Sequence, residues 1–112
     1  MAERVPIPVT YLLNTPILTA YGRWSFRGPL DHATARALAL EAVSAVGHED
    51  TARLIAELLE TPVSCQRCEV RMLPGERALV FRLLRRQEEG DVLDIDRLRK
   101  ESYEFGLLER VE

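Results

Sequence analysis

The sequence of 112 residues contains very little lysine and few cysteines. Lys100 is the single lysine, so the basic side chains are otherwise arginine, and the net charge is −3. A negative net charge argues against a protein that coats DNA or RNA through bulk electrostatics. A chain of this length can bury a core without disulfide or metal staples. We therefore expect one domain over residues 1–112 and no bulk binding of DNA.

No apolar run approaches the length of a membrane span. The longest run, at 78–84, is interrupted by Arg82. The first residues, Met1 to Arg4, lack the apolar region of a signal peptide. These absences predict a cytoplasmic protein with no membrane partner.

Common metal and phosphate motifs are also missing from the sequence. None of the six glycines forms a phosphate-binding loop. Cys65 and Cys68 form a lone C-x-x-C, and zinc would require two further ligands at a recognisable spacing. The acidic run at 88–96 is interpreted as a solvated turn and helix cap. The sequence therefore predicts no metal, no cofactor and two ordinary cysteines.

Alternation and apolar runs predict five strands, and helical spacing of apolar residues predicts three helices. The expected strands lie at 9–14, within 21–29, and at 68–72, 78–84 and 105–111, and the expected helices at 31–43, 49–59 and 95–102. This order of elements predicts an α/β fold, a compact mixed β-sheet flanked by about three helices.

Several residues set the expected boundaries of these elements. Asp31 is a good N-cap for the first helix, and Thr61-Pro62 ends the second. Residues 74–77 predict a hairpin-type turn. The strand at 78–84 is apolar on both faces, which predicts a central position with cover on both sides. Because three short helices would not supply all of that cover, we expect a homodimer.

Two segments carry the residue types needed to handle a phosphodiester. His48 lies at the start of the second predicted helix, where unpaired backbone N–H groups favour an anion. Arg85, Arg86 and Glu89 follow the central strand. Histidine exchanges protons near neutral pH, and arginine holds phosphate with a planar charged fork. A carboxylate beside them would hold the imidazole protonated.

Each of these residues also has a simpler interpretation. His48 could cap the helix or lie half-buried in the core. Arg86 could be a solvated charge at a strand end, and Glu89 a plain turn residue. The only other histidine, His32, is expected to be exposed and inert.

Four segments, at 11–14, 46–51, 67–70 and 85–90, resemble a known family. Their sequences are similar to those of the viral ring nucleases that act as type III anti-CRISPR proteins, and of their CRISPR-associated cellular relatives. The resemblance follows the same order over nearly the whole chain and is densest after Ser44. Each motif alone is weak, whereas four in register make a specific signal.

The resemblance implies a homodimer that binds cyclic tetra-adenylate across its two-fold axis, in the host cytoplasm if the protein is viral. It implies metal-independent cleavage to linear di-adenylate with a 2′,3′-cyclic phosphate, which switches off type III CRISPR signalling. The family's catalytic histidine, arginine and glutamate fall on His48, Arg86 and Glu89. Its ligand-binding positions fall on Asn14, Gly47, Asp50, Thr51 and Arg67.

The chain departs from the viral members at two positions. Ile17 and Asp50 stand where those members carry serines, so two hydroxyls near the ligand are replaced. The alternative function is a non-catalytic module of the same fold that sequesters a cyclic nucleotide or binds RNA. The set of His48, Arg86 and Glu89 favours the enzyme, because a sequestering protein needs no proton donor.

Overall fold

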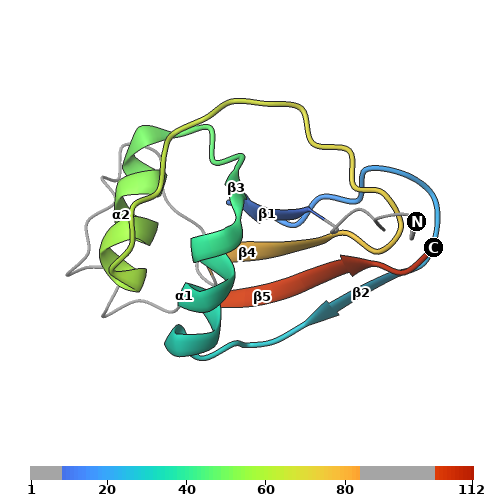
Figure 1. Cartoon of the computed structure of the whole chain (residues 1–112), viewed down its shortest axis with the longest axis horizontal. Helices are drawn as coiled ribbons and strands as arrows, with labels where there is room; N and C mark the ends of the chain where they lie inside the picture. Colours follow the sequence, from blue (N-terminus) through green and yellow to red (C-terminus); the bar gives the residue numbers. More distant parts are fainter. Residues whose placement is uncertain (1–8, 84–102) are drawn as a thin grey trace, which may run out of the picture.

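The computed structural model describes residues 9–83 and 103–112 (Figure 1). These residues form a five-stranded sheet and two helices. The predicted α/β class and the mixed sheet are therefore confirmed. The strands are β1 (Thr10–Leu13), β2 (Trp24–Arg27), β3 (Val43–Ser44), β4 (Arg77–Leu83) and β5 (Tyr103–Arg110), and the helices are α1 (His32–Glu41) and α2 (Glu49–Leu59).

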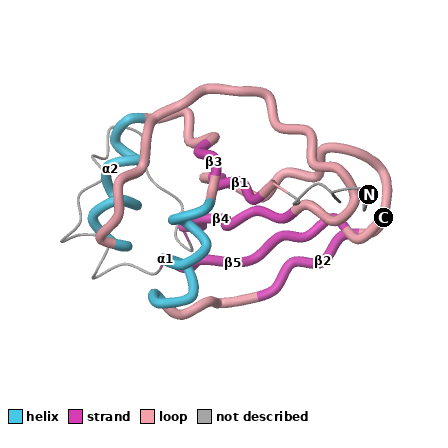
Figure 2. Tube along the Cα trace, in the orientation of Figure 1, coloured by secondary structure: helices cyan, strands magenta, loops and turns pink. Residues whose placement is uncertain are grey.

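The strand order is β2-β5-β4-β1-β3, with a parallel half and an antiparallel half. β1 pairs in parallel with β3 and β4, whereas β5 pairs antiparallel with β4 and β2. In parallel strands the carboxyl ends meet at one edge of the sheet. Leu13, Ser44 and Leu83 therefore end their strands at the same edge, which in Figure 2 is the edge towards α2.

The central strand β4 is covered on both faces, as its apolar sequence predicts. On one face the two helices pack against Leu12, Leu79, Phe81 and Phe105. On the other face Ala78 and Val80 join a second cluster. Its other buried members are Leu13, Met72 and Leu108, with Tyr11, Trp24, Ala45 and Val70 packed around them.

Both described helices begin where the sequence predicts. Asp31 is the N-cap of α1, and its carboxylate accepts a hydrogen bond of 2.7 Å from the backbone N–H of Thr34. α2 spans the predicted 49–59 and buries one apolar face of five residues. α1 ends at Glu41, before the predicted 43, because Val43 and Ser44 pair with β1 instead. Within the described ranges, no helix is long and apolar enough to cross a membrane.

The predicted strand at 68–72 is wrong. Residues 62–73 run without a turn, bend or strand pairing, along the length of the molecule (Figure 2). Val70 and Met72 of this segment pack on the second face of the sheet. The alternation of apolar and polar residues therefore arises because the apolar side chains pack on the face of the sheet, although the segment is not one of its strands.

Three further expectations have mixed outcomes. The turn at Pro74–Gly75 exists, and Gly75 adopts φ 89°, but it joins the unpaired segment to β4 and closes no hairpin. β3 was not predicted, because two residues are too few to show a period. The predicted helix at 95–102 lies outside the described residues.

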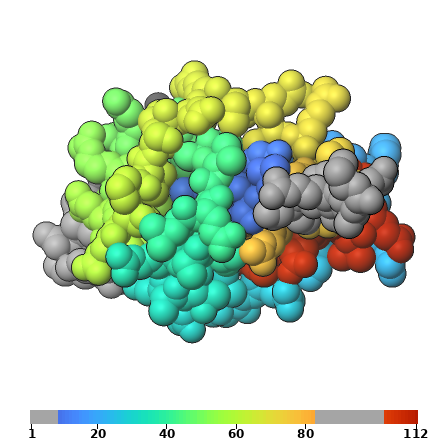
Figure 3. Space-filling model, viewed as in Figure 1, coloured from blue at the N-terminus to red at the C-terminus, as the bar shows by residue number. Residues whose placement is uncertain are grey.

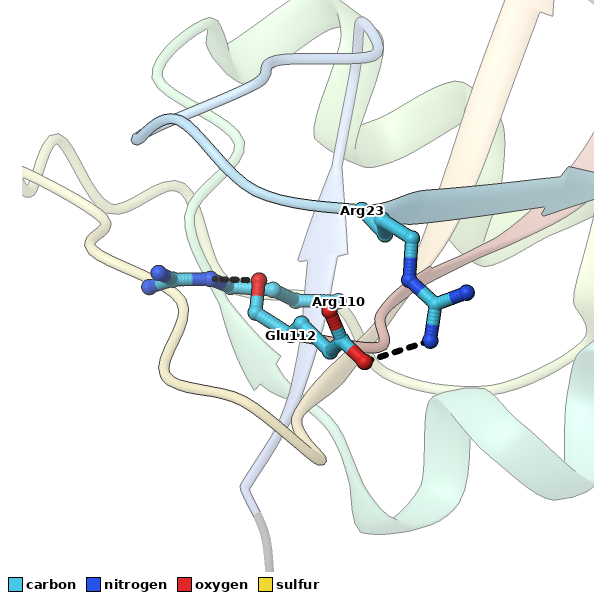
Figure 4. Close-up of polar contacts among 3 residues, drawn as sticks. All are labelled: Arg23, Arg110 and Glu112. Carbon is cyan, nitrogen blue, oxygen red and sulfur yellow. Dashed lines mark hydrogen bonds and ion pairs between the residues drawn. The ribbon is translucent and has the colours of Figure 1, made fainter.

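Arg110 is the last residue of β5 and connects several segments at the end of the molecule opposite α2 (Figures 1 and 4). Its guanidinium donates hydrogen bonds to the carbonyls of Met72 (2.7 Å), Tyr21 (3.3 Å) and Glu112 (3.1 Å). Arg23 forms an exposed ion pair of 2.5 Å with the carboxylate of Glu112. The segments at Tyr21 and Met72, which are far apart in sequence, are thereby joined to the end of β5.

Candidate functional site

His48 is the backbone N-cap of α2, but its side chain does not cap the helix. Its backbone is extended (φ −124°, ψ 125°), and its carbonyl accepts the N–H of Ala52 at 3.0 Å. The imidazole makes no capping hydrogen bond and is exposed. The position at the helix start is thus confirmed, and the interpretation as a half-buried core histidine is wrong.

The sheet brings the Asn14 and His48 segments to the same edge. After β3 the chain stays beside β1, because the N–H of Ala45 donates to the carbonyl of Leu12 at 2.9 Å. Val46 is fully buried in the core, which fixes the position of the chain just before Gly47 and His48. Asn14 directly follows β1 and is half-buried. The predicted ligand contact Asn14 and the predicted catalytic residue His48 therefore follow neighbouring parallel strands at their carboxyl ends.

Arg67 lies against the Gly47 backbone, directly beside His48 in sequence. Its Nε donates a hydrogen bond of 3.1 Å to the carbonyl of Gly47. A Cβ atom on Gly47 would lie only 3.0 Å from Cγ of Arg67, so the glycine makes room for this approach. Within the described residues no carboxylate pairs with Arg67, whereas Arg71 pairs with Glu69 at 3.0 Å. A permanent positive charge with no carboxylate partner in the described part of the chain therefore borders the N-terminus of α2.

Three contacts hold the Arg67 segment in place. The hydroxyl of Ser44 donates to the carbonyl of Ser64 at 2.6 Å, and the N–H of Gln66 donates to the carbonyl of Val46 at 2.8 Å. Each of these pairs, like Arg67 with Gly47, joins residues 20 apart in sequence. Residues 64–67 therefore run alongside 44–47 in the same direction. The sequence analysis missed Ser44, because its place in the short strand β3 and its burial appear only in the folded structure.

The first turn of α2 is acidic, which suits the positive end of the helix dipole. Asp50 forms an ion pair of 3.5 Å with Arg53, and both side chains are largely exposed. Such an exposed pair is weak, at about 0–1 kcal/mol. The negative charge of Asp50 therefore has a partner on its own helix. Thr51 lies in the same turn and is half-buried.

The predicted partners of His48 on the strand-end motif lie outside the described residues. β4, the strand that leads to Arg86 and Glu89, ends at Leu83 on the same edge as β1 and β3. In residues 9–83 and 103–112, no group of three or more histidine, cysteine or acidic side chains could hold a metal ion. The absence of a metal site therefore remains a prediction for the whole chain.

His32 is exposed as predicted, but it is not isolated. Its Nε2 lies 2.7 Å from the hydroxyl of Tyr103, and the two rings stack with centroids 5.9 Å apart. The pair lines a cavity of about 450 Å³ between the start of α1 and the end of α2. Arg36, Glu57 and Glu60 also line it.

Two comparisons with known proteins point to the same family. No curated protein matches the chain. The model of the STIV B116-like family matches residues 10–105. The solved structure of B116 of Sulfolobus turreted icosahedral virus is similar, with a TM-score of 0.71 and 25% sequence identity. That match covers 91% of this chain and 99% of B116.

Proposed function

The chain belongs to the STIV B116-like family, and from that premise we propose that it is a ring nuclease. In this proposal a homodimer binds cyclic tetra-adenylate and cleaves it to linear di-adenylate with a 2′,3′-cyclic phosphate. The result is to switch off type III CRISPR signalling. Three lines of support are the family resemblance of four motifs, the similarity to a viral protein, and the geometry around His48.

The observation that carries the proposal is the environment of the His48 imidazole. It is exposed at the N-terminus of α2, makes no capping hydrogen bond, and is next to the glycine that Arg67 contacts at 3.1 Å. A helix N-terminus and the guanidinium of Arg67, which has no carboxylate partner among the described residues, together favour a phosphate group. A titratable group at that place suits proton transfer to a phosphodiester.

The proposed reaction needs no metal in its chemistry. The 2′-hydroxyl of one adenosine gives its proton to solvent water and attacks the adjacent phosphorus, forming the 2′,3′-cyclic phosphate. The bond from phosphorus to the 5′-oxygen of the next nucleotide breaks. That 5′-oxygen leaves with a proton from the imidazolium of His48, acting as general acid. Arg67 and the N–H groups at the start of α2 balance the charge that develops on the phosphate.

Two residues outside the described ranges complete the proposed site. Arg86 would share the charge on the phosphate, and Glu89 would keep His48 protonated. Asn14, Gly47, Asp50 and Thr51 would contact the ring or shape its surroundings.

The test is incubation of the protein with cyclic tetra-adenylate in EDTA, with the products separated by chromatography. We expect linear di-adenylate ending in a 2′,3′-cyclic phosphate. Tight binding with no cleavage would select the sequestering module instead. Cleavage that appears only when Mg²⁺ or Mn²⁺ is restored would overturn the metal-independent mechanism.

A further inference from the structure

Cys65 and Cys68 flank the segment that holds Arg67 beside His48. Both thiols are free and exposed. Sγ of Cys68 lies 4.0 Å from the carbonyl of Ser44, a weak contact. The two residues between the cysteines, Gln66 and Arg67, make the hydrogen bonds to Val46 and Gly47. The cysteine pair therefore brackets the contacts that position the arginine.

The backbone at these cysteines has the wrong shape for a disulfide. Residues 62–73 have neither a turn nor a bend. Three residues of extended chain span roughly 10 Å between Cα atoms. A disulfide requires a Cα separation of about 4.4–6.8 Å. Closing the bond would therefore pull residues 65–68 into a turn, with Gln66 and Arg67 at its corner.

We propose that Cys65 and Cys68 are a redox-sensitive modification site, and that their disulfide detaches Gln66 and Arg67 from the Val46–Gly47 backbone. The reduced form holds Arg67 in place, and the oxidised form releases it. In reducing cytosol a cysteine pair of this kind serves as a sensor and not as a staple. The consequence for substrate binding rests on the proposed function, whereas bond formation and detachment do not.

The oxidant in this proposal is a low-molecular-weight disulfide. One protein thiolate attacks a sulfur of glutathione disulfide, which forms a mixed disulfide and releases one glutathione thiolate. The second protein thiolate then attacks the sulfur of the first cysteine and releases the other glutathione. Two protein thiols are oxidised, and one glutathione disulfide is reduced to two thiols.

The structural test uses the full chain and no nucleotide. The protein is equilibrated with glutathione disulfide, its intact mass is measured, and amide hydrogen exchange is followed at Gln66. We expect the loss of two hydrogens, faster exchange at Gln66, and reversal by dithiothreitol. Cys65→Ser and Cys68→Ser are the matched controls, because each keeps a small exposed side chain and cannot close the ring. Mixed or intermolecular disulfides alone, or unchanged exchange at Gln66 in the oxidised protein, would overturn the proposal.

The functional test measures binding of cyclic tetra-adenylate to both redox forms. We expect oxidation to weaken binding roughly tenfold in the wild type, and to have no further effect on Arg67→Ala. Equal affinity of the two redox forms in the wild type would overturn the link to the site. If neither form binds the ring, the proposed function fails, while mass and exchange still decide whether the cysteines form the switch.

Discussion

His48 is an unfavourable residue for the N-cap of α2, because its side chain does not stabilise the start of the helix. Serine, threonine, aspartate and asparagine are favoured at an N-cap because their side chains accept a backbone N–H. The imidazole of His48 accepts none and stays exposed. Residues that are unfavourable for local structure, such as a non-capping side chain at an N-cap, are expected at functional sites.

The change His48→Ser separates stability from activity. Serine can cap α2, so we expect the free energy of unfolding to rise by about 1 kcal/mol. Cleavage of cyclic tetra-adenylate should fall roughly 10²–10⁴-fold, because the leaving oxygen has no positioned acid. Thermal unfolding and single-turnover cleavage measure the two effects. His32→Ala is the control and should cleave at the wild-type rate; a similar rate in His48→Ser would remove the general-acid role.

Arg67 and Arg71 form a natural pair for testing the anion site. Both lie on the same segment at 62–73, but Arg71 forms an ion pair of 3.0 Å with Glu69, whereas Arg67 has no carboxylate partner among residues 9–83 and 103–112. Losing a charged hydrogen bond typically costs about 1.5–3 kcal/mol, so Arg67→Ala should weaken ligand binding roughly tenfold or more. Arg71→Ala should change the dissociation constant little. Equal effects of the two changes, measured by titration calorimetry, would place the anion elsewhere.

At the scale of elements, the start of α1 provides a pH-dependent contact. The hydrogen bond from the Thr34 N–H lowers the pKa of Asp31 below its ordinary value. A lowered pKa in the folded state stabilises the protein above the ordinary carboxyl pKa. That stabilisation is lost as the pH falls through the folded pKa.

The change Asp31→Asn tests this contact, because asparagine caps a helix without titrating. We expect the unfolding free energy of the wild type, relative to Asp31→Asn, to fall as the pH drops below about 4. Asp31→Ala should be less stable than Asp31→Asn at every pH. Urea unfolding at several pH values measures this, and a constant difference between wild type and Asp31→Asn would contradict it.

At the scale of the whole molecule, Arg110 joins segments that no single element connects. Its three hydrogen bonds reach the carbonyls of Tyr21, Met72 and Glu112, and Figure 4 shows the bond to Glu112. Arg110→Ala should lower the free energy of unfolding by about 1–3 kcal/mol. Arg23→Ala is the comparison, because its exposed ion pair with Glu112 contributes only about 0–1 kcal/mol. Chemical denaturation should rank the two changes in that order.

The proposed substrate has internal symmetry, and two copies of His48 would cut it at opposite positions. We therefore expect a homodimer with about twice the 12.7 kDa mass of the chain. Light scattering at micromolar concentration measures this mass. A stable monomer would contradict binding of the ring across a two-fold axis. The space-filling view shows the segment after α2, in yellow, on the surface of the molecule (Figure 3).

The sequence by itself determined the elements whose signals are local. The apolar period and the Thr61-Pro62 stop fixed the bounds of α2. Asp31 identified the start of α1, and a doubly apolar run identified β4 as central. The position of His48 at a helix N-terminus followed from the same signals.

Only the tertiary structure decided which segments pair as strands and which distant residues are in contact. Residues 68–72 alternate like a strand but find no strand partner, because their apolar side chains pack on the face of the sheet. Val43 and Ser44 show no period, yet pairing with β1 makes them a strand. The contact of Arg67 with Gly47 joins residues 20 apart, and no local pattern encodes such a distance. Pairing and long-range contacts depend on the whole chain folding around one sheet, so only the folded structure could show that Arg67 contacts the backbone of Gly47.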